Sequence, residues 1–342
     1  MDAPVHSWDY RRRRGLNWFP LGLSYAFLYM GRYNLNVAQS ALGEDTMSRS
    51  DFGSLFAIGA AVYSISFLIN GPLTDRWGGR RTMLIGMAGS LLANFLMGRV
   101  LYGRTMFGWD LPIFSTFGLL YGMNMYFQSF AAAAIVTTKA PWFHVRERGK
   151  FSTIFGYMIA FGIFFAFDWG FAIVDATRGT ITGELGFWAS MFHWLIGGPP
   201  AGVDRNWCLF FTPAAILSVL WFFVYGFVRN TPAEAGFRNF NTGDESISQE
   251  DEQLSTRKIF RRILTHPVLK FVCAIEFCSG VMRNGALQWY PKLAEAVGFK
   301  KTFFITSNWG TVMLLCGIIG GTLTGWFSDK RFESKRAPMV AI

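Results

Sequence analysis

Charged residues, histidines and cysteines are scarce in this chain. Only 16% of its 342 residues are Asp, Glu, Lys or Arg, and there are four histidines and four cysteines. The cysteines lie in apolar stretches, at positions without metal-ligand spacing to a histidine, and they suggest no disulfide framework. No nucleophile stands beside a candidate base. We therefore expect neither an enzyme nor a protein that holds a metal or another cofactor.

Apolar residues take the place of the missing charges. The chain is 51% hydrophobic and 18% aromatic. Eight stretches are long and apolar enough to cross a bilayer, at about 16–40, 52–73, 82–103, 112–137, 151–174, 207–228, 268–290 and 303–327. Eight spans predict an all-α polytopic membrane protein whose surrounding partner is the lipid bilayer.

The net charge of +10 is distributed in the way that membrane topology requires. With the N-terminus placed in the cytoplasm, 21 of the 32 Lys and Arg residues fall on the inner side and eight on the outer side. This is the positive-inside pattern, so we expect a cytoplasmic N-terminus and no nucleic-acid partner. The basic segment Tyr10–Arg14 leads into a first span without a small-residue cleavage site, which predicts an uncleaved span and no signal peptide.

Two arginines lie deep inside predicted spans. Arg32 and Arg283 each follow the start of their span by about fifteen residues, which carries the side chain about 22 Å into a hydrocarbon core about 30 Å thick. Such a charge costs a few to more than ten kcal/mol unless it faces water or a partner. Guanidinium groups bind phosphate or carboxylate through paired N–H donors, so we predict an anion site built from both arginines, with structural arginines as the alternative.

An internal repeat supports a site made from two halves. Gly71 to Arg76 follows the second span and Gly325 to Lys330 follows the eighth, both with the pattern Gly-x-x-x-Asp-(Arg/Lys). Each pattern ends a unit of two spans that begins with a deep arginine, and both units enter the membrane from the same side. Substrate sites of transporters lie near the midplane between such repeats.

Polar side chains accompany the first arginine. Tyr25, Tyr29, Arg32 and Asn36 are spaced 4, 3 and 4, which places them on one helical face. Hydroxyl and amide groups can complete the hydrogen-bonding shell of a tetrahedral anion. We add Tyr63, Asn124 and Gln128 from neighbouring spans as candidate binding residues, although interhelical packing explains Asn124 and Gln128 about as well.

Two acids and one group of surface charges complete the candidates. Glu276, two turns before Arg283, can balance that arginine or carry a proton, and Asp168 can carry a proton or be solvated. Charges on the predicted cytoplasmic face can form ion pairs that close a gate, or can be a static solvated cluster. These gate candidates are Asp75, Arg76, Arg80, Arg146, Glu147, Arg148 and Asp329.

Several of these motifs resemble a known family. The loop from Gly71 to Arg81 resembles the loop signature of the major facilitator superfamily, with Gly79 where arginine is usual. More specific are Tyr25, Tyr29 and Arg32, Trp142 with Glu147-Arg148-Gly149, Arg229-Asn-Thr-Pro232 with Gly236, and Arg283 with Trp289-Tyr-Pro291. Together they resemble the organophosphate:phosphate antiporters, which include glycerol-3-phosphate and hexose-phosphate transporters.

The resemblance implies a fold and a function. It implies the major facilitator fold, exchange of an organophosphate for inorganic phosphate by rocking of two six-helix bundles, and a phosphoryl site at Arg32 and Arg283 with Tyr25, Tyr29 and Tyr63. We expect a monomer in a bacterial inner membrane. The expected domains are an N-terminal arm 1–15, a six-helix bundle 16–228, a cytoplasmic linker 229–267, and the first two helices of a second bundle, 268–342. The family has twelve spans, so we expect about four helices to be missing after Ile342.

Departures from the family leave other functions open. Tyr33, Phe67, Ile159 and Gln288 stand where some or all members have charged or titratable residues, so the site has fewer positive charges. A proton-coupled carrier of a sugar acid, using Glu276 or Asp168, is one alternative. A membrane sensor of hexose phosphate is the other, because one branch of the family signals instead of transporting.

Overall fold

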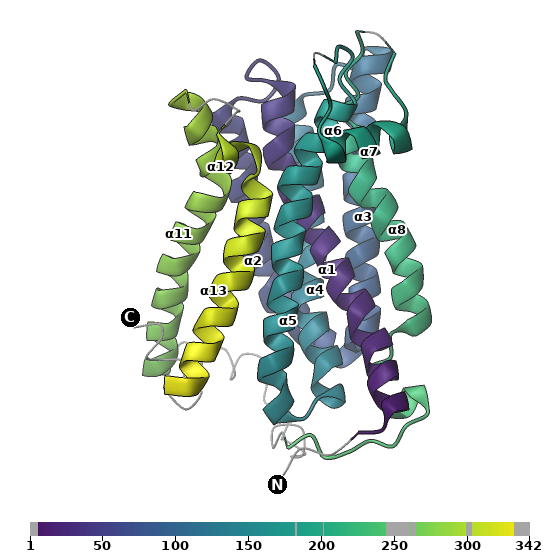
Figure 1. Ribbon diagram of the computed structural model, residues 1–342, viewed down its shortest axis with the longest axis vertical. Helices are drawn as coiled ribbons and strands as arrows, with labels where there is room; N and C mark the ends of the chain where they lie inside the picture. The colour runs from purple at the N-terminus through teal and green to yellow at the C-terminus, as the bar shows by residue number, and fades with distance from the viewer. Residues whose placement is uncertain are drawn as a thin grey trace. The chain divides into compact units, whose positions relative to one another are not determined.

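The computed structural model describes residues 6–181, 183–200, 202–243, 261, 265–298 and 303–331 (Figure 1). The regular elements of these residues are all helices. They are α1 (Trp8–Leu42), α2 (Arg49–Trp77), α3 (Gly79–Phe107), α4 (Ile113–Lys139), η1 (Ala140–Trp142), α5 (Val145–Phe164), the π-helix η2 (Phe165–Trp169), α6 (Gly170–Ala176), α7 (Phe187–Ile196), α8 (Cys208–Phe227), η3 (Ala233–Ala235), α11 (Pro267–Ala296), α12 (Phe304–Ser307) and α13 (Trp309–Arg331).

The long helices begin and end at residues suited to those places. Ser48 caps α2 in a capping box with Asp51, in which each side chain accepts a hydrogen bond from the other residue's backbone N–H. Helices α1 and α2 end at Gly43 and Gly78, whose φ angles of 77° and 83° are readily adopted only by glycine.

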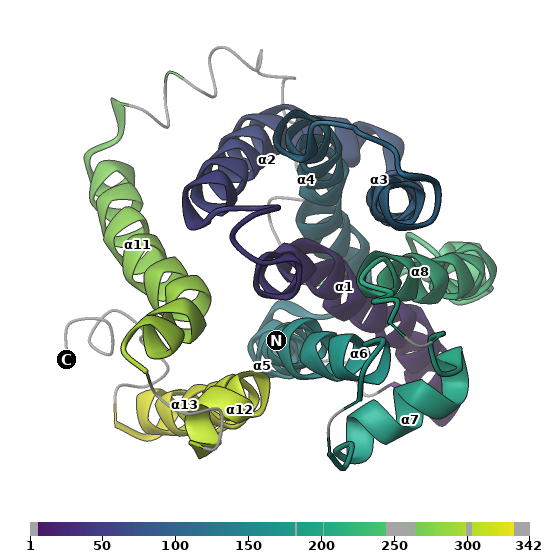
Figure 2. The same ribbon diagram turned by 90° about the horizontal axis from the view of Figure 1, so that it is seen from above.

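The chain divides into two compact units. The first comprises Met1–Thr242 with Gly310–Ile342, and the second comprises Gly243–Trp309. In the first unit α3 and α4 pack together, α2 lies on α4, and α8 lies on α1 and α3. Figure 2 shows α1 inside the bundle, next to α4, α5 and α8. This central place explains why every residue from Ser24 to Gln39 is buried except Tyr29, which has intermediate exposure.

Within the described residues, six helical stretches are long and apolar enough to cross a membrane by length and composition. They are Arg49–Trp77, Gly79–Phe107, Ile113–Trp142, Phe151–Ala176, Cys208–Phe227 and Trp309–Ser328. The predicted spans 16–40 and 268–290 lie in the long helices α1 and α11 but are not among the six. Both contain a deep arginine and further polar residues, which lower their mean hydropathy.

Two predicted segments differ from the structure in detail. The predicted span 303–327 is not one helix, because α12 ends at Ser307 and α13 begins at Trp309 after a turn at Asn308. The segment between the predicted spans 151–174 and 207–228 contains the helix α7, whose Trp188 and Phe192 pack on Trp169 with ring centroids 5.5 and 5.3 Å apart.

The start of the predicted linker is also more structured than its polar composition indicates. Phe237 and Phe240 pack against a buried cluster of Tyr10, Trp142, Phe143 and Phe151. Val145 donates its backbone N–H to the carbonyl oxygen of Thr242 at 2.9 Å. The start of the predicted linker therefore contacts the core, because two aromatic side chains give the segment apolar area to bury. The predicted part 244–260 lies outside the described residues.

Candidate functional site

The predicted anion-binding arginine of the first half is buried in the middle of α1. Arg32 is 8% exposed, and its Nε donates a hydrogen bond to Oε1 of Gln128 on α4 at 3.0 Å. Its guanidinium carbon lies 4.9 Å from the ring centroid of Tyr29 and 4.5 Å from that of Tyr63. Electron-rich ring faces at these distances stabilise a cation that has left water. Among the hydrogen bonds of the described residues, Arg32 donates only through Nε, so its two terminal nitrogens are available to a ligand.

A network of buried amides orients Gln128. The Nε2 of Gln128 donates to Oδ1 of Asn124 at 3.0 Å and to Oγ of Ser90 at 3.3 Å. Asn124 in turn donates from Nδ2 to the backbone oxygen of Gly31 at 2.8 Å. Because its amide nitrogen is engaged in this way, the oxygen of Gln128 faces the arginine. Such satisfied interhelical bonds hold α1 and α4 in a fixed register.

Three members of this network were not among the residues predicted from the sequence. Ser90 and Asn94 lie on α3, and Ser90 donates to Oδ1 of Asn124 at 2.5 Å. Asn34 on α1 donates to Oδ1 of Asn94 at 2.9 Å. The sequence signal was two polar residues four apart in an apolar span, which on a helix share one face. That signal says nothing about which neighbouring helix they meet.

The tyrosines predicted beside Arg32 lie close to one another. The rings of Tyr25 and Tyr29 are 5.1 Å apart between centroids. Tyr25 therefore contacts Tyr29, which in turn lies against the guanidinium of Arg32. The ring centroid of Tyr33 lies 5.7 Å from that of Tyr29 and 6.3 Å from that of Phe167. Asn36 is buried one turn further along α1. The structure therefore brings Tyr25, Tyr29, Tyr63 and Gln128 together with Arg32.

The second half of the predicted site lies in the second unit. Arg283 and Glu276 are both exposed on α11, and no ion pair joins them in the described part of the chain. At the far end of this helix Leu287 and Gln288 are buried. The indole of Trp309 donates to the backbone oxygen of Leu287 at 3.1 Å and stacks on Tyr290 at 4.3 Å. The joint site of Arg32 and Arg283 remains a prediction.

Asp168 is not a solvated acid. Its carboxylate accepts hydrogen bonds from the backbone N–H groups of Gly310 and Thr311 at 2.7 and 2.8 Å, and from the hydroxyl of Thr311. These donors belong to the first turn of α13.

The predicted gate residues have partners other than one another. Asp75 accepts from the hydroxyl of Thr137 at 3.0 Å, and Glu147 forms an ion pair with Arg14 of the N-terminal arm at 2.8 Å. Arg148 donates to the backbone oxygens of Ala140 and Phe143. The ion pairs of the described residues include none between the Asp75–Arg76 loop and Glu147–Arg148.

The remaining gate candidates are engaged, exposed or outside the described part. Arg80 donates hydrogen bonds to residues outside the predicted gate. Its backbone N–H donates to Oδ1 of Asn230 at 2.9 Å, and its side chain donates to the backbone oxygen of Tyr225. Arg76 is exposed. The side chains of Arg146 and Asp329 lie outside the described residues. The predicted gate thus stays a prediction.

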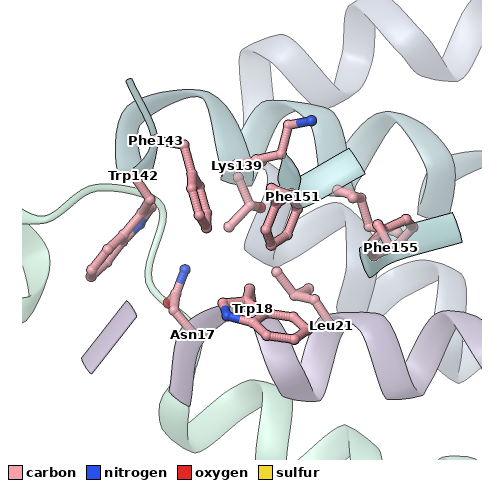
Figure 3. Close-up of a pocket in the computed structure, with 10 residues that line it drawn as sticks. Asn17, Trp18, Leu21, Lys139, Trp142, Phe143, Phe151 and Phe155 are labelled. Atoms are coloured by element: carbon pink, nitrogen blue, oxygen red, sulfur yellow. The ribbon is translucent and has the colours of Figure 1, made fainter. Parts of the chain in front are cut away.

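Aromatic side chains fill the end of the bundle next to the N-terminal arm (Figure 3). The cavity among Trp18, Lys139, Trp142 and Phe151 has a volume of about 10 Å³, which is too small for a metabolite. The Tyr10 hydroxyl donates to the backbone oxygen of Trp142 at 3.1 Å, and burial raises the pKa of Tyr10 to about 12. This cluster is a structural core and offers no substrate site.

The described residues contain no group of three or more His, Cys, Asp or Glu side chains placed to hold a metal ion. Cys208 is buried, and Cys273, Cys278 and Cys316 are exposed, all as free thiols.

Comparison with known families identifies the class of protein. Residues 21–342 match the family model of the Major Facilitator Superfamily, so the chain belongs to that family. It is an integral membrane protein of a transporter family, and its relatives are not enzymes. Among solved structures, the D-xylose-proton symporter superposes with a TM-score of 0.53 at 15% identity, covering 91% of this chain and 68% of that one. This likeness supports the fold.

Three of the curated relatives illustrate the range of names among them. The glycerol-3-phosphate transporter of Bacillus subtilis is 25% identical over 96% of this chain and 68% of its own length. The membrane sensor protein UhpC of Salmonella typhimurium is 24% identical over 94% of this chain and 65% of its own length. The D-galactonate transporter of Escherichia coli is 26% identical over 96% of this chain and 70% of its own length. The chain thus spans about two thirds of the length of these relatives.

Proposed function

We propose that this protein is a secondary transporter that exchanges a phosphorylated metabolite, a sugar phosphate or glycerol-3-phosphate, for inorganic phosphate. The observation that carries the proposal is the environment of Arg32. Its guanidinium is buried at mid-helix, positioned through Nε by Gln128, and its terminal nitrogens meet no acceptor among the described residues. A guanidinium so placed presents two parallel N–H donors, the arrangement that binds phosphoryl oxygens in pairs.

The second arginine completes the proposed site. Arg283 occupies the matching depth in the second half of the chain, on α11. In alternating access the two halves rock about a substrate held between them, and each half contributes one arginine. Tyr25, Tyr29 and Tyr63 supply hydroxyl groups around the anion. The proposed orientation has a cytoplasmic N-terminus in a bacterial inner membrane, and the proposed assembly is a monomer.

One second function has a specific observation in its favour. The D-galactonate transporter among the relatives is named for a carboxylate substrate, and Tyr33 gives this site one positive charge fewer than the related antiporters have. A proton-coupled symporter of a sugar acid would bind its carboxylate at the same guanidinium. It would need a titrating acid, for which Glu276 is available on α11. The sensor named among the relatives would bind a hexose phosphate without moving it.

Exchange of radiolabelled phosphate in proteoliposomes that contain the intact protein distinguishes these functions. The antiporter exchanges external for internal phosphate without a proton gradient, and organophosphates compete. A sugar-acid symporter accumulates its substrate only with a proton gradient and ignores phosphate. A sensor binds hexose phosphate in a thermal-shift or calorimetric measurement and catalyses no flux. Either of these last two results would contradict the proposal.

A further inference from the structure

Asp168 joins two helices that are far apart in the sequence. It lies in η2, between α5 and α6, and its three hydrogen bonds reach the first turn of α13, 142 and 143 residues further on. Figures 1 and 2 both show α13 beside α5. We refer to the bonds of Asp168 with Gly310 and Thr311 as the Asp168 contact.

The contact has the chemistry of a helix cap supplied by another helix. The first backbone N–H groups of an α-helix have no partner within the helix, and their aligned dipoles attract negative charge. The Asp168 carboxylate satisfies two of them at once and also accepts from the Thr311 hydroxyl. A charged acceptor makes such bonds stronger than neutral ones.

The backbone on both sides lets the two helices approach closely. A Cβ at position 310 would lie 2.7 Å from Oδ1 of Asp168 and 3.0 Å from the Cα of Phe164, so a larger residue would force these atoms to shift. On the other helix the π-helical turn Phe165–Trp169 carries Asp168. Single π-turns inside α-helices are rare and concentrate at functional sites, because they redirect side chains.

The two helices stay close further along. A Cβ added at Gly317 would lie 3.4 Å from the Cβ of Ala160, and the hydroxyls of Tyr157 and Thr322 are 2.7 Å apart. A groove of about 520 Å³ lies beside these residues, and its lining includes Ser152, Gly156, Tyr157, Gly317, Gly320 and Gly321. The helix pair is therefore held by Asp168 at the start of α13 and is bordered by an open groove further along.

We propose that the Asp168 contact closes the outer end of the α5–α13 pair and that it breaks and re-forms during transport. Asp168 is then a positioning residue that sets the balance between the arrangements open to either side of the membrane. It does not carry the coupled proton. This inference rests on the proposed transport function, because only a transporter alternates between two such arrangements. The groove beside Gly317 and Gly320 leaves α5 and α13 room to shift against each other when the contact opens.

A disulfide cross-link between α5 and α13 measures the contact directly. The pair Ala160→Cys and Gly317→Cys is spaced for a disulfide, and it is introduced after the four native cysteines are replaced. The rate of oxidative cross-linking is followed with and without inorganic phosphate at about 1 mM, the upper end of usual KM values. Phosphate exchange is measured on the same preparations without the cysteine pair.

The expected result separates four variants. Asp168→Ala should slow cross-linking roughly tenfold and remove its response to phosphate, because a charge-assisted contact is lost. Asp168→Asn keeps one acceptor, so its cross-linking rate should fall between those of Asp168→Ala and the unsubstituted protein. Thr311→Val keeps the backbone donors and removes only a hydroxyl, so it should slow cross-linking by roughly threefold. Asp175→Asn is the matched control, since Asp175 is exposed and pairs only with Arg178 at 3.6 Å. It should change nothing.

Two results would overturn the inference. One is unchanged cross-linking, with its phosphate response intact, in Asp168→Ala and Thr311→Val. The other is uptake by the unsubstituted protein that depends on a proton gradient, together with an Asp168→Asn protein that keeps cross-linking but loses that dependence, which would make Asp168 the proton site. If cross-linking depends on Asp168 while the unsubstituted protein exchanges no phosphate, the Asp168 contact is supported and the proposed exchange of phosphate is contradicted.

Discussion

Arg32 and Gln128 are joined by a hydrogen bond of 3.0 Å from the guanidinium Nε to the amide Oε1, although they lie 96 residues apart. The bond ties α1 to α4 at the centre of the first unit. It orients the guanidinium through Nε and leaves the two terminal nitrogens for an anion. The amide is neutral, so it fixes the arginine without cancelling its charge.

Arg32→Lys and Arg283→Lys should each weaken phosphate binding about ten- to a hundred-fold, which corresponds to roughly 1.5–3 kcal/mol for one charge-assisted bond. Lysine keeps the charge but loses the planar pair of donors. Competition of unlabelled phosphate in the exchange assay measures the affinity. Arg99→Lys is the control, because Arg99 lies against the rings of Tyr102 and Trp109 near the end of α3. Normal exchange by either deep-arginine variant would rule out the two-arginine site.

Gln128→Glu should weaken anion binding by at least about tenfold, while the protein still folds. The substitution keeps the shape and the acceptor but places a negative charge on Arg32, so the guanidinium is neutralised before the ligand arrives. The same phosphate competition assay gives the affinity, and size-exclusion chromatography checks the fold. Unaltered affinity would mean that Arg32 does not face the substrate.

Glu276→Gln tests proton coupling. If Glu276 only balances charge near Arg283, exchange should continue with an altered affinity and little change in its pH dependence. Exchange at several pH values and gradient-driven uptake are compared in the same vesicles. Loss of gradient-driven uptake with exchange retained would instead favour the sugar-acid symporter.

Gly31→Ala should destabilise the protein by roughly 1–3 kcal/mol, because its Cβ would lie 2.9 Å from Nδ2 of Asn94, which the buried amide network holds in place. Gly15→Ala is the matched control in the same helix, since nothing lies within 4 Å of its Cβ, and alanine favours a helix by about 1 kcal/mol over glycine. Thermal unfolding in detergent should show a lower midpoint for the first variant and an equal or higher one for the second. Equal midpoints for Gly31→Ala and the parent would contradict the packing described.

The docking of the N-terminal arm should depend on pH through His6. Its ring stacks on Tyr10 at 4.3 Å and contacts Phe240 at 4.8 Å, and burial, together with Arg14, lowers the pKa of His6 below its ordinary 6.5. A lowered pKa favours the neutral form in the folded state. The stabilisation is therefore complete above pH 6.5 and is lost as the pH falls through the lowered pKa.

A spin label at the exposed position Trp8 can follow that docking in a cysteine-free background. Its mobility should rise as the pH is lowered below about 6, the region of ordinary histidine titration. His6→Phe keeps an aromatic ring and removes the titrating group, so its mobility should stay constant. An identical pH response in the two proteins would exclude His6 as the cause.

The sequence by itself determined the class of the protein and which side chains share a face of α1 with Arg32. Apolar stretches of spanning length, interrupted by Arg32 and Arg283, are visible in one dimension because a hydrocarbon core permits few other residues. The spacing of Tyr25, Tyr29 and Arg32 predicted their common face, because helical periodicity is local.

Only the tertiary structure decided which helices meet and which donor faces which acceptor. The amides of Ser90, Asn94 and Asn124 join around Gln128 because α3, α4 and α1 pack together, and no local pattern encodes that choice. Asp168 is the clearest case. In the sequence it is an isolated acid near the end of a span, and the first turn of a helix 142 residues away gives it its partners. Hydrogen bonds between distant segments depend on packing in three dimensions, which a single sequence does not spell out.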